Sequence, residues 1–264
     1  MKIACIQMDT RPADPDRNID HACRLIREAA RRERPDVVVL PELWDVGFFP
    51  REGLRDLCDA DGRRTRGVLG GLARELGVDL VAGSVADLRD GRVYNTAYVF
   101  DRAGDCVYRY DKAHLFSPSG EPDFFAPGDR CGVFRLDGVT CGLILCYDLR
   151  FPELTRSLRL RGADLLFIPA QWPAARLAHL ETLTRARAIE NQMFTVLANS
   201  CADGFGTVCA GHSALIDPWG VTLAAAGAGE EIIAADLRLE VLEEIRSSIN
   251  VFRDRRPELY GAQG

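Results

Sequence analysis

Residues 139–154 read VTCGLILCYDLRFPEL, and this stretch decides how the rest of the chain is interpreted. Seven mostly apolar residues lead to Cys146, polar and charged residues follow at once, and Pro152 then opens a segment with a helical pattern. This order predicts a buried strand, a turn and a helix. A cysteine at such a strand end lies near backbone N–H groups that can stabilise a thiolate. An inert buried cysteine can occupy the same position, so its partners have to be found elsewhere in the chain.

Length and composition favour a globular protein that binds neither nucleic acid nor membrane. The chain has 264 residues, enough for one large domain or two small ones, and 47% of them are hydrophobic. A formal net charge of −6 and scattered arginines argue against nucleic acid as a partner. The start, MKIACIQMDTRP, has too short an apolar run for a signal peptide. No apolar stretch approaches the roughly 20 residues of a membrane-spanning helix.

Nine cysteines are distributed along the chain, and none of them forms a CxxC pair. A zinc site would show tighter cysteine spacing with histidines nearby. Since no secretion signal is present either, we expect reduced thiols in a cytoplasmic protein. We expect no metal and no cofactor.

Strands follow one another in two ways, through helices and through hairpins. Apolar patterns predict helices at residues 14–34, 63–76, 150–161, 176–192 and 239–247. Strands are predicted at 2–9, 36–43, 78–85, 163–170, 193–200 and 231–237, and hairpins at 92–112, 131–146 and 209–226. Because no linker or repeat interrupts this pattern, we expect one domain over residues 1–264, with mixed sheets covered by helices in layers.

Two further strand ends carry residues that could act with Cys146. Glu42 follows the apolar run VVVLP, where partial desolvation would suit its carboxylate to general-base work. A helix-capping or ion-paired glutamate would fit the same position. Lys112 ends the predicted strand 106–112, although most lysines are simply solvated. Glu121 lies in the proline-rich loop SPSGEPDFF, where it could be no more than a turn residue.

A histidine base is the alternative to a carboxylate base for a cysteine nucleophile. The chain has only four histidines, and His114 is the best candidate among them. None of the four lies at a clear strand end with a carboxylate to orient it. A Cys–His enzyme is therefore the weaker interpretation of this sequence.

Taken together, these positions resemble the nitrilase superfamily of carbon–nitrogen hydrolases. The motifs are LPELW around Glu42, DKAHLF around Lys112, SGEPDFF around Glu121 and CYDLRFPEL around Cys146, with further similarity in RARAIENQ (185–192) and GHSALIDPWG (211–220). The matching motifs follow in order through nearly the whole chain. One such motif would be weak support, but the ordered set is highly specific.

The resemblance implies an α/β fold of four layers, an α-β-β-α sandwich, commonly dimerised through its helices. It also implies a catalytic triad of Glu42, Lys112 and Cys146, with Glu121 as a fourth member. In this mechanism Cys146 attacks the carbonyl carbon of a small amide and forms a thioester, while Glu42 moves the protons. Lys112 and the backbone N–H of Tyr147 would hold the oxyanion.

CYDLRFPEL and KAHLF look like the ω-amidase and Nit-like branch of the superfamily, which hydrolyses dicarboxylate monoamides such as 2-oxoglutaramate. In that branch the arginine four residues after the nucleophile holds the substrate carboxylate, and here that residue is Arg150. A guanidinium offers a carboxylate two parallel hydrogen bonds. Arg150 could instead pair with Asp148 or Glu153. The QWP sequence resembles the NWP of bacterial relatives, so we expect Trp172 to form part of the pocket wall.

Other activities fit parts of the same sequence. Leu180 stands where relatives often carry tryptophan, which weakens the transfer of a substrate from the resemblance. An N-carbamoyl-amide hydrolase or a deaminated-glutathione amidase of the same superfamily is the near alternative, and a nitrilase is a more distant one. A metal-dependent phosphatase or nuclease can use a similar sandwich, but it would need acidic and histidine clusters at strand ends. A catalytically silent binding protein would not need Glu42, Lys112 and Cys146 together.

Overall fold

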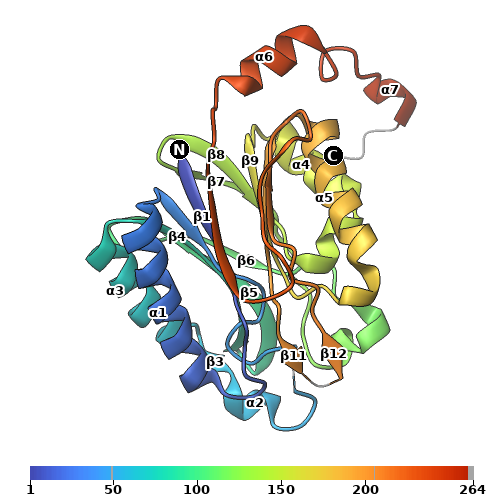
Figure 1. Ribbon diagram of the computed structural model, residues 1–264. Coiled ribbons are helices and arrows are strands. Elements are labelled where there is room, and N and C mark those ends of the chain that lie inside the picture. The colour runs from blue at the N-terminus through green and yellow to red at the C-terminus, as the bar shows by residue number, and fades with distance from the viewer. Residues whose placement is uncertain (49, 205, 261–264) are drawn as a thin grey trace.

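Two β-sheets lie face to face with helices on their outer sides (Figure 1). The computed structural model describes residues 1–48, 50–204 and 206–260. Its helices are α1 (Pro15–Glu33), α2 (Leu54–Leu57), α3 (Arg63–Leu76), α4 (Pro152–Leu160), α5 (Leu177–Asn191), α6 (Val241–Ser248) and α7 (Pro257–Tyr260). All five predicted helices are present, and the four-residue helices α2 and α7 are additional.

The first sheet has seven strands in the order β15-β1-β2-β4-β5-β6, with β3 paired to β4. They are β1 (Lys2–Gln7), β2 (Val37–Val39), β3 (Asp59–Ala60), β4 (Asp79–Arg89), β5 (Arg92–Phe100), β6 (Cys106–Asp111) and β15 (Glu231–Asp236). β1, β2 and β4 are parallel, whereas β5 and β6 follow as an antiparallel meander. The sequence of β2 is VVV, and its complete burial is typical of a central parallel strand.

The second sheet has six strands in the order β14-β13-β10-β9-β8-β7. They are β7 (Val133–Leu136), β8 (Val139–Leu143), β9 (Leu165–Ala170), β10 (Phe194–Asn199), β13 (Ala214–Ile216) and β14 (Thr222–Ala225). The hairpin between β7 and β8 turns at Asp137 and Gly138, whose φ angles of 49° and 81° are those of the tight turn that suits a twisted hairpin. A separate short pair, β11 (Asp203–Gly204) and β12 (Thr207–Val208), lies outside every predicted strand and hairpin.

Layers of apolar side chains hold these elements together. Val39 and Phe167 belong to the core between the two sheets. Leu69 of α3 packs with α1 against the outer face of the first sheet, and Leu158 of α4 and Leu180 of α5 pack against the second (Figure 1). The resulting order of layers is α-β-β-α, so the predicted fold class is confirmed.

The carboxyl ends of the parallel strands determine where a site can form. β1, β2 and β4 run parallel in one sheet, and β8, β9 and β10 run parallel in the other. In α/β sheets, loops leaving the carboxyl ends of such strands commonly build the ligand site. The loops after β2, β6, β8 and β9 carry the residues described below.

The C-terminal segment lies above the sandwich in Figure 1 and is attached to the layer of α4 and α5. Gln192 Nε2 donates to the Ile249 carbonyl at 2.8 Å, and Arg246 Nη2 donates to Asp164 Oδ1 at 2.7 Å. Among the described residues, no helix is both long enough and apolar enough to span a membrane.

Candidate active site

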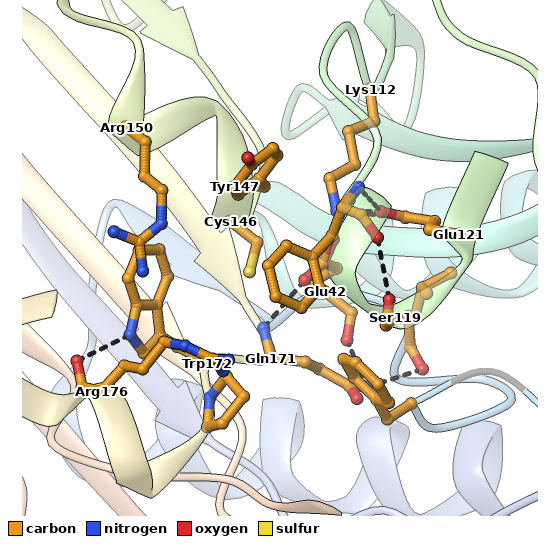
Figure 2. Close-up of a pocket in the computed structure, with 14 residues that line it drawn as sticks. Glu42, Lys112, Ser119, Glu121, Cys146, Tyr147, Arg150, Gln171, Trp172 and Arg176 are labelled. Carbon is orange, nitrogen blue, oxygen red and sulfur yellow. Dashed lines mark hydrogen bonds and ion pairs between the residues drawn. The ribbon is translucent and has the colours of Figure 1, made fainter. Parts of the chain in front are cut away.

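The loops at the strand ends carry four of the residues identified in the sequence. Glu42 lies shortly after β2, Cys146 shortly after β8, and Lys112 directly after β6. Glu121 lies in a short 3-10 turn of the loop that follows Lys112. All four line one pocket, and even Cys146, the most exposed of them, is only 8% exposed (Figure 2). The structure thus brings together the four residues predicted to be catalytic.

Lys112 lies between two carboxylates. Its Nζ is 2.8 Å from Glu42 Oε1 and 2.9 Å from Glu121 Oε2, and all three side chains are buried. Burial favours a lower pKa for Lys112, but the charges of Glu121 and Glu42 outweigh it and hold that pKa well above its usual value. Lys112 is therefore an ammonium ion at neutral pH, with three N–H groups to donate.

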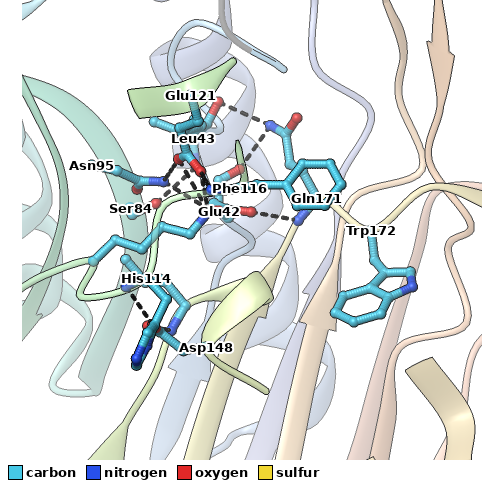
Figure 3. A network of polar contacts seen from close by, with 12 residues as sticks. Glu42, Leu43, Ser84, Asn95, His114, Phe116, Glu121, Asp148, Gln171 and Trp172 are labelled. Carbon is cyan, nitrogen blue, oxygen red and sulfur yellow. Dashed lines mark hydrogen bonds and ion pairs between the residues drawn. The ribbon is translucent and has the colours of Figure 1, made fainter. Parts of the chain in front are cut away.

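Asn95 and Gln171 complete the polar network around the carboxylates, and the sequence analysis assigned a role to neither (Figure 3). Asn95 Nδ2 donates to Glu42 Oε1 at 2.8 Å and to Glu121 Oε1 at 3.2 Å. The backbone N–H of Gln171 donates to Glu42 Oε2 at 2.9 Å, and its Nε2 donates to the Glu42 carbonyl at 2.8 Å. In the sequence, the only indication of these roles is an amide side chain that lies within an apolar strand, for Asn95, or directly after one, for Gln171.

The thiol of Cys146 is neutral in this site. Burial, followed by the negative charge of Glu42, raises the pKa of Cys146 well above its usual value. The charge of Lys112 and the backbone N–H of Gln171 lower that pKa, but by less. Backbone N–H groups near the strand end therefore do not produce a resting thiolate, because desolvation outweighs them. A base must remove the thiol proton as the sulfur reacts.

The turn that carries Cys146 is held in an unusual conformation. Cys146 has a φ of 43°, in the left-handed region that a residue other than glycine occupies only when its surroundings hold it there. Asp148 in the same turn provides such contacts. Its fully buried carboxylate accepts hydrogen bonds from the backbone N–H of Leu145 at 2.9 Å and from the Tyr110 hydroxyl at 2.8 Å.

His114 contributes to this turn rather than to the pocket. Its backbone N–H and its Nδ1 lie 2.9 Å and 2.8 Å from Asp148 Oδ1, and its ring stacks on Phe151 at 3.7 Å between centroids. His114 is not among the residues that line the pocket with Cys146, so the geometry does not favour a Cys–His pair. Within the described ranges, no group of three or more His, Cys, Asp or Glu side chains could hold a metal ion.

Aromatic and cationic side chains form the pocket wall. The pocket is partly open to solvent and its exposed lining is mostly apolar, as in many small-molecule sites. Arg150, Trp172 and Tyr147 all line it. The guanidinium carbon of Arg150 lies 4.5 Å from the centroid of the Trp172 ring, which is a cation–π contact. Tyr147 packs its ring at a steep angle against Phe116, with 5.0 Å between the centroids.

Arg150 forms neither of the ion pairs considered from the sequence. The Asp148 carboxylate is occupied by other donors, and the polar neighbour of Arg150 Nη1 is His179 Nδ1 at 3.3 Å. No acidic side chain among the described residues pairs with Arg150 at salt-bridge distance. Its positive charge is therefore available to a ligand in the pocket.

Comparison with known proteins places this site in a family. A model of the carbon–nitrogen hydrolase family matches residues 2–247, which include Glu42, Lys112, Glu121 and Cys146. The chain belongs to the carbon–nitrogen hydrolase family. The site described above is thus the candidate active site of a hydrolase.

Similar proteins narrow the activity of this hydrolase. The 2-oxoglutaramate amidase of Bacillus subtilis (strain 168) is 43% identical over 258 residues, or 98% of each chain. Omega-amidase NIT2 of Homo sapiens is 34% identical over 275 residues, covering 99% of this chain and 97% of the relative. A mutant of the amidase from Nesterenkonia sp. AN1 superposes with a TM-score of 0.84 at 29% identity, covering 98% of each chain, and shows Michael addition of acrylamide at its active-site cysteine. This hydrolase is an amidase of the nitrilase superfamily.

Proposed function

We propose that this hydrolase is an ω-amidase, which releases ammonia from small amides with a carboxylate at their far end. The observation that carries the proposal is the buried cluster of Glu42, Lys112 and Glu121 beside the neutral thiol of Cys146, at one pocket. The unpaired guanidinium of Arg150 in the wall of that pocket favours an anionic substrate. The similarity to a 2-oxoglutaramate amidase supports the same substrate class.

In the first half of the reaction, Cys146 forms a thioester. Glu42 removes the thiol proton as Sγ attacks the carbonyl carbon, which is required because the pKa of Cys146 is raised. One N–H of Lys112 donates to Glu42 and a second is shared by the two oxygens of Glu121. The third, with the backbone N–H of Tyr147, stabilises the oxyanion. The carbon–nitrogen bond then breaks, and Glu42 returns its proton to the leaving nitrogen, which departs as ammonia.

In the second half, water hydrolyses the thioester. Glu42 takes a proton from the water as its oxygen attacks the same carbon, and Lys112 again stabilises the oxyanion. The carbon–sulfur bond breaks and Glu42 gives its proton back to the Cys146 sulfur. The product is a carboxylic acid, which loses its proton to water, and the site returns to its starting state. Glu121 acts by fixing Lys112, because it accepts two of the contacts of Nζ, at 3.1 Å and 2.9 Å.

Arg150 and Trp172 bind the far end of the substrate in this proposal. The indole supports the guanidinium, whose carbon lies 4.5 Å from the ring centroid. Because His179 contacts only Nη1, the edge formed by Nε and Nη2 can donate two parallel hydrogen bonds to a carboxylate. Tyr147 contributes its backbone N–H to the oxyanion and its ring to the wall. Removing one oxyanion donor of this kind typically lowers the rate by about 100- to 1000-fold.

Ammonia release from a panel of amides tests the proposal. The panel contains 2-oxoglutaramate, 2-oxosuccinamate, deaminated glutathione, an N-carbamoyl compound and a simple nitrile. An ω-amidase releases ammonia fastest from the two oxo acid monoamides. Faster release from deaminated glutathione or from the N-carbamoyl compound would show that the proposed substrate class is wrong, although the enzyme would still be a carbon–nitrogen hydrolase.

A cysteine variant tests the nucleophile. Cys146→Ala should abolish ammonia release while the circular dichroism spectrum stays that of the wild type, because little core volume is removed. Cys106→Ala, at an exposed cysteine outside the pocket, is the matched control and should retain activity. Near-normal turnover by Cys146→Ala would show that the nucleophile is misassigned.

We further propose a homodimer located in the cytoplasm. The outer face of α5 and the β13–β14 hairpin leave three large apolar side chains exposed, namely Ile189, Trp219 and Val221. None of the nine cysteines, all of which lie in the described ranges, forms a disulfide bond, as expected in a reducing compartment. Light scattering on the purified wild type should give a molar mass twice that of one chain. In the variant Trp219→Glu the measured mass should fall towards that of the monomer. A monomeric wild type would contradict the dimer.

A further inference from the structure

A second arginine, Arg176, lines the same pocket as Arg150 (Figure 2). It lies at the end of the 3-10 turn Ala174–Arg176, directly before α5, and was not singled out in the sequence. As with Arg150, no acidic side chain of the described residues lies within salt-bridge distance of its guanidinium. The pocket wall therefore carries two cations that the protein itself leaves unneutralised.

Aromatic rings hold both guanidinium groups, and one of these rings contacts both arginines. Arg150 lies over Trp172, and the guanidinium carbon of Arg176 lies 5.6 Å from the centroid of the Phe116 ring. Trp172 Nε1 donates to the carbonyl of Arg176 at 2.9 Å, so the same indole that supports Arg150 also fixes the backbone of Arg176. Such support lowers the conformational entropy that each arginine loses when it binds an anion.

The two parts of the pocket differ in charge: acidic side chains outnumber the cation at the thiol, whereas the wall is positive. Two carboxylates and one ammonium, from Glu42, Glu121 and Lys112, surround the thiol, so the reacting end favours a neutral amide over an anion. Arg150 and Arg176 make the wall positive. A substrate that is neutral at one end and anionic at the other matches both parts, whereas a cationic group beside its carboxylate would lie next to two guanidinium groups.

We propose that Arg176 is a specificity-determining residue that, with Arg150, binds the far carboxylate of the substrate and rejects substrates with an α-ammonium group. The inference rests on the proposed ω-amidase function and refines its substrate class. Monoamides of dicarboxylic acids with an oxo group or a hydrogen at the α-carbon are accepted, and glutamine and asparagine are disfavoured. Arg150 alone would hold a carboxylate, and a second cation adds its own Coulomb repulsion against an adjacent ammonium.

The test compares succinamate with glutamine in wild type and in Arg176→Gln. We expect kcat/KM for succinamate to fall by about 10- to 100-fold, mainly through KM, because one charge-assisted contact is lost. The preference for succinamate over glutamine should fall by a similar factor, because the repulsion of the α-ammonium is weakened at the same time. Arg176→Lys keeps the charge and should retain most of the preference.

Arg51→Gln is the matched control. Arg51 lines a second hollow next to the pocket, and it is not among the residues that line the pocket with Cys146. Its Nη2 donates to the Ser119 carbonyl at 3.4 Å. This variant changes the net charge near the entrance by the same amount. If Arg51→Gln and Arg176→Gln lose the preference for succinamate over glutamine equally, the overall electrostatic field around the pocket explains the effect. That result would overturn the role of Arg176.

A binding measurement separates this inference from the proposed function. Calorimetry with Cys146→Ala and with Cys146→Ala/Arg176→Gln should show succinamate binding that weakens by about 10-fold or more in the double variant. If the wild type releases no ammonia from any dicarboxylate monoamide, the proposed function fails, whatever Arg176 binds. If the wild type is active but Arg176→Gln keeps both the preference and the affinity, only the role of Arg176 is wrong.

Discussion

Lys112 is the residue on which the charges of the site depend. Its Nζ contacts both Glu42 and Glu121, and no part of this cluster is solvated enough to be screened by water. One cation is shared by two anions, so the cluster carries a net negative charge. Burial, followed by the negative charge of Glu42, raises the pKa of Cys146, and Lys112 offsets only part of this, so the thiol stays protonated until Glu42 takes its proton.

Replacing Lys112 should therefore cost stability as well as activity. Lys112→Met leaves two buried carboxylates without a counter-ion, and we expect a loss of about 3–5 kcal/mol in the free energy of unfolding, measured with urea at pH 7. The double variant Lys112→Met/Glu121→Gln removes one of these carboxylates and should recover roughly half of that loss, while remaining inactive. If the double variant is no more stable than the single one, lost packing rather than charge explains the effect.

At the scale of elements, the site consists of loops that are attached to one another by buried carboxylates. Asp148 connects the turn of Cys146, through the N–H of Leu145, to the segment that carries Lys112, through Tyr110 before that residue and His114 after it. Asp45 connects the loop of Glu42 to β4, because both of its carboxylate oxygens accept the backbone N–H of Ala86, at 3.2 Å and 3.0 Å.

Asp148→Asn should loosen the turn that carries the nucleophile. An amide NH2 would face backbone N–H donors that need an acceptor, so we expect a loss of about 1–3 kcal/mol and a lower kcat with little change in KM. Tyr110→Phe removes a single donor to Asp148 and should cost only about 1 kcal/mol. Thermal unfolding and steady-state kinetics measure both effects. A loss in Tyr110→Phe as large as that in Asp148→Asn would contradict this ranking.

Asp45 should make stability depend on pH between about 4 and about 7. Burial, partly offset by the Ala86 hydrogen bonds, raises the pKa of Asp45 to about 7, above its value of about 3.9 in an unfolded chain. In this range the folded state binds the proton more tightly. The contribution is fully present below about pH 4 and is lost as pH rises through about 7, by up to about 4 kcal/mol.

Asp45→Asn isolates this contribution. The variant cannot titrate and keeps one oxygen for the Ala86 N–H, so its stability relative to wild type should increase from pH 5 to pH 8 and then level off. Urea unfolding of both proteins across this range measures the difference, and other groups titrate equally in both. Parallel stability curves for the two proteins would contradict a raised pKa for Asp45.

At the scale of the whole molecule, the site exists only when the two sheets are packed together. Glu42 and Lys112 follow strands of the first sheet, whereas Cys146 and Gln171 follow strands of the second. The core between the sheets holds these loops at bonding distance. Phe167 on β9 is fully buried in that core and stacks near Phe134, with 6.3 Å between the ring centroids.

We expect the two sheets to unfold in one transition. Phe167→Ala should lower the free energy of unfolding by about 3–5 kcal/mol, because it leaves a cavity that both sheets share. Calorimetry should still show a single peak, at a lower temperature. Val68→Ala on the exposed side of α3 is the control and should change stability by less than about 0.5 kcal/mol. Two separate peaks in Phe167→Ala would mean that the sheets fold independently.

Much of the fold could be predicted because its signals are local. The apolar spacing of α1 and of α3 and the turn at Asp137 and Gly138 each lie within a short segment. The β11–β12 pair could not be predicted, since its two-residue strands are too short to show alternation. The role of Gln171 could not be predicted for another reason, because its hydrogen bonds to Glu42 join positions that are 129 residues apart in the sequence.

Motifs and periodicity are properties of neighbouring residues, so the layered α/β fold, the family resemblance and the candidate residues Glu42, Lys112, Glu121 and Cys146 could be predicted from the sequence. The protonation of Cys146, the partners of Lys112 and the free charges of Arg150 and Arg176 became visible only in the folded protein. Each of these depends on desolvation and on charges that distant strands bring within a few ångströms. Such distances arise only when the two sheets pack, and no local pattern encodes them.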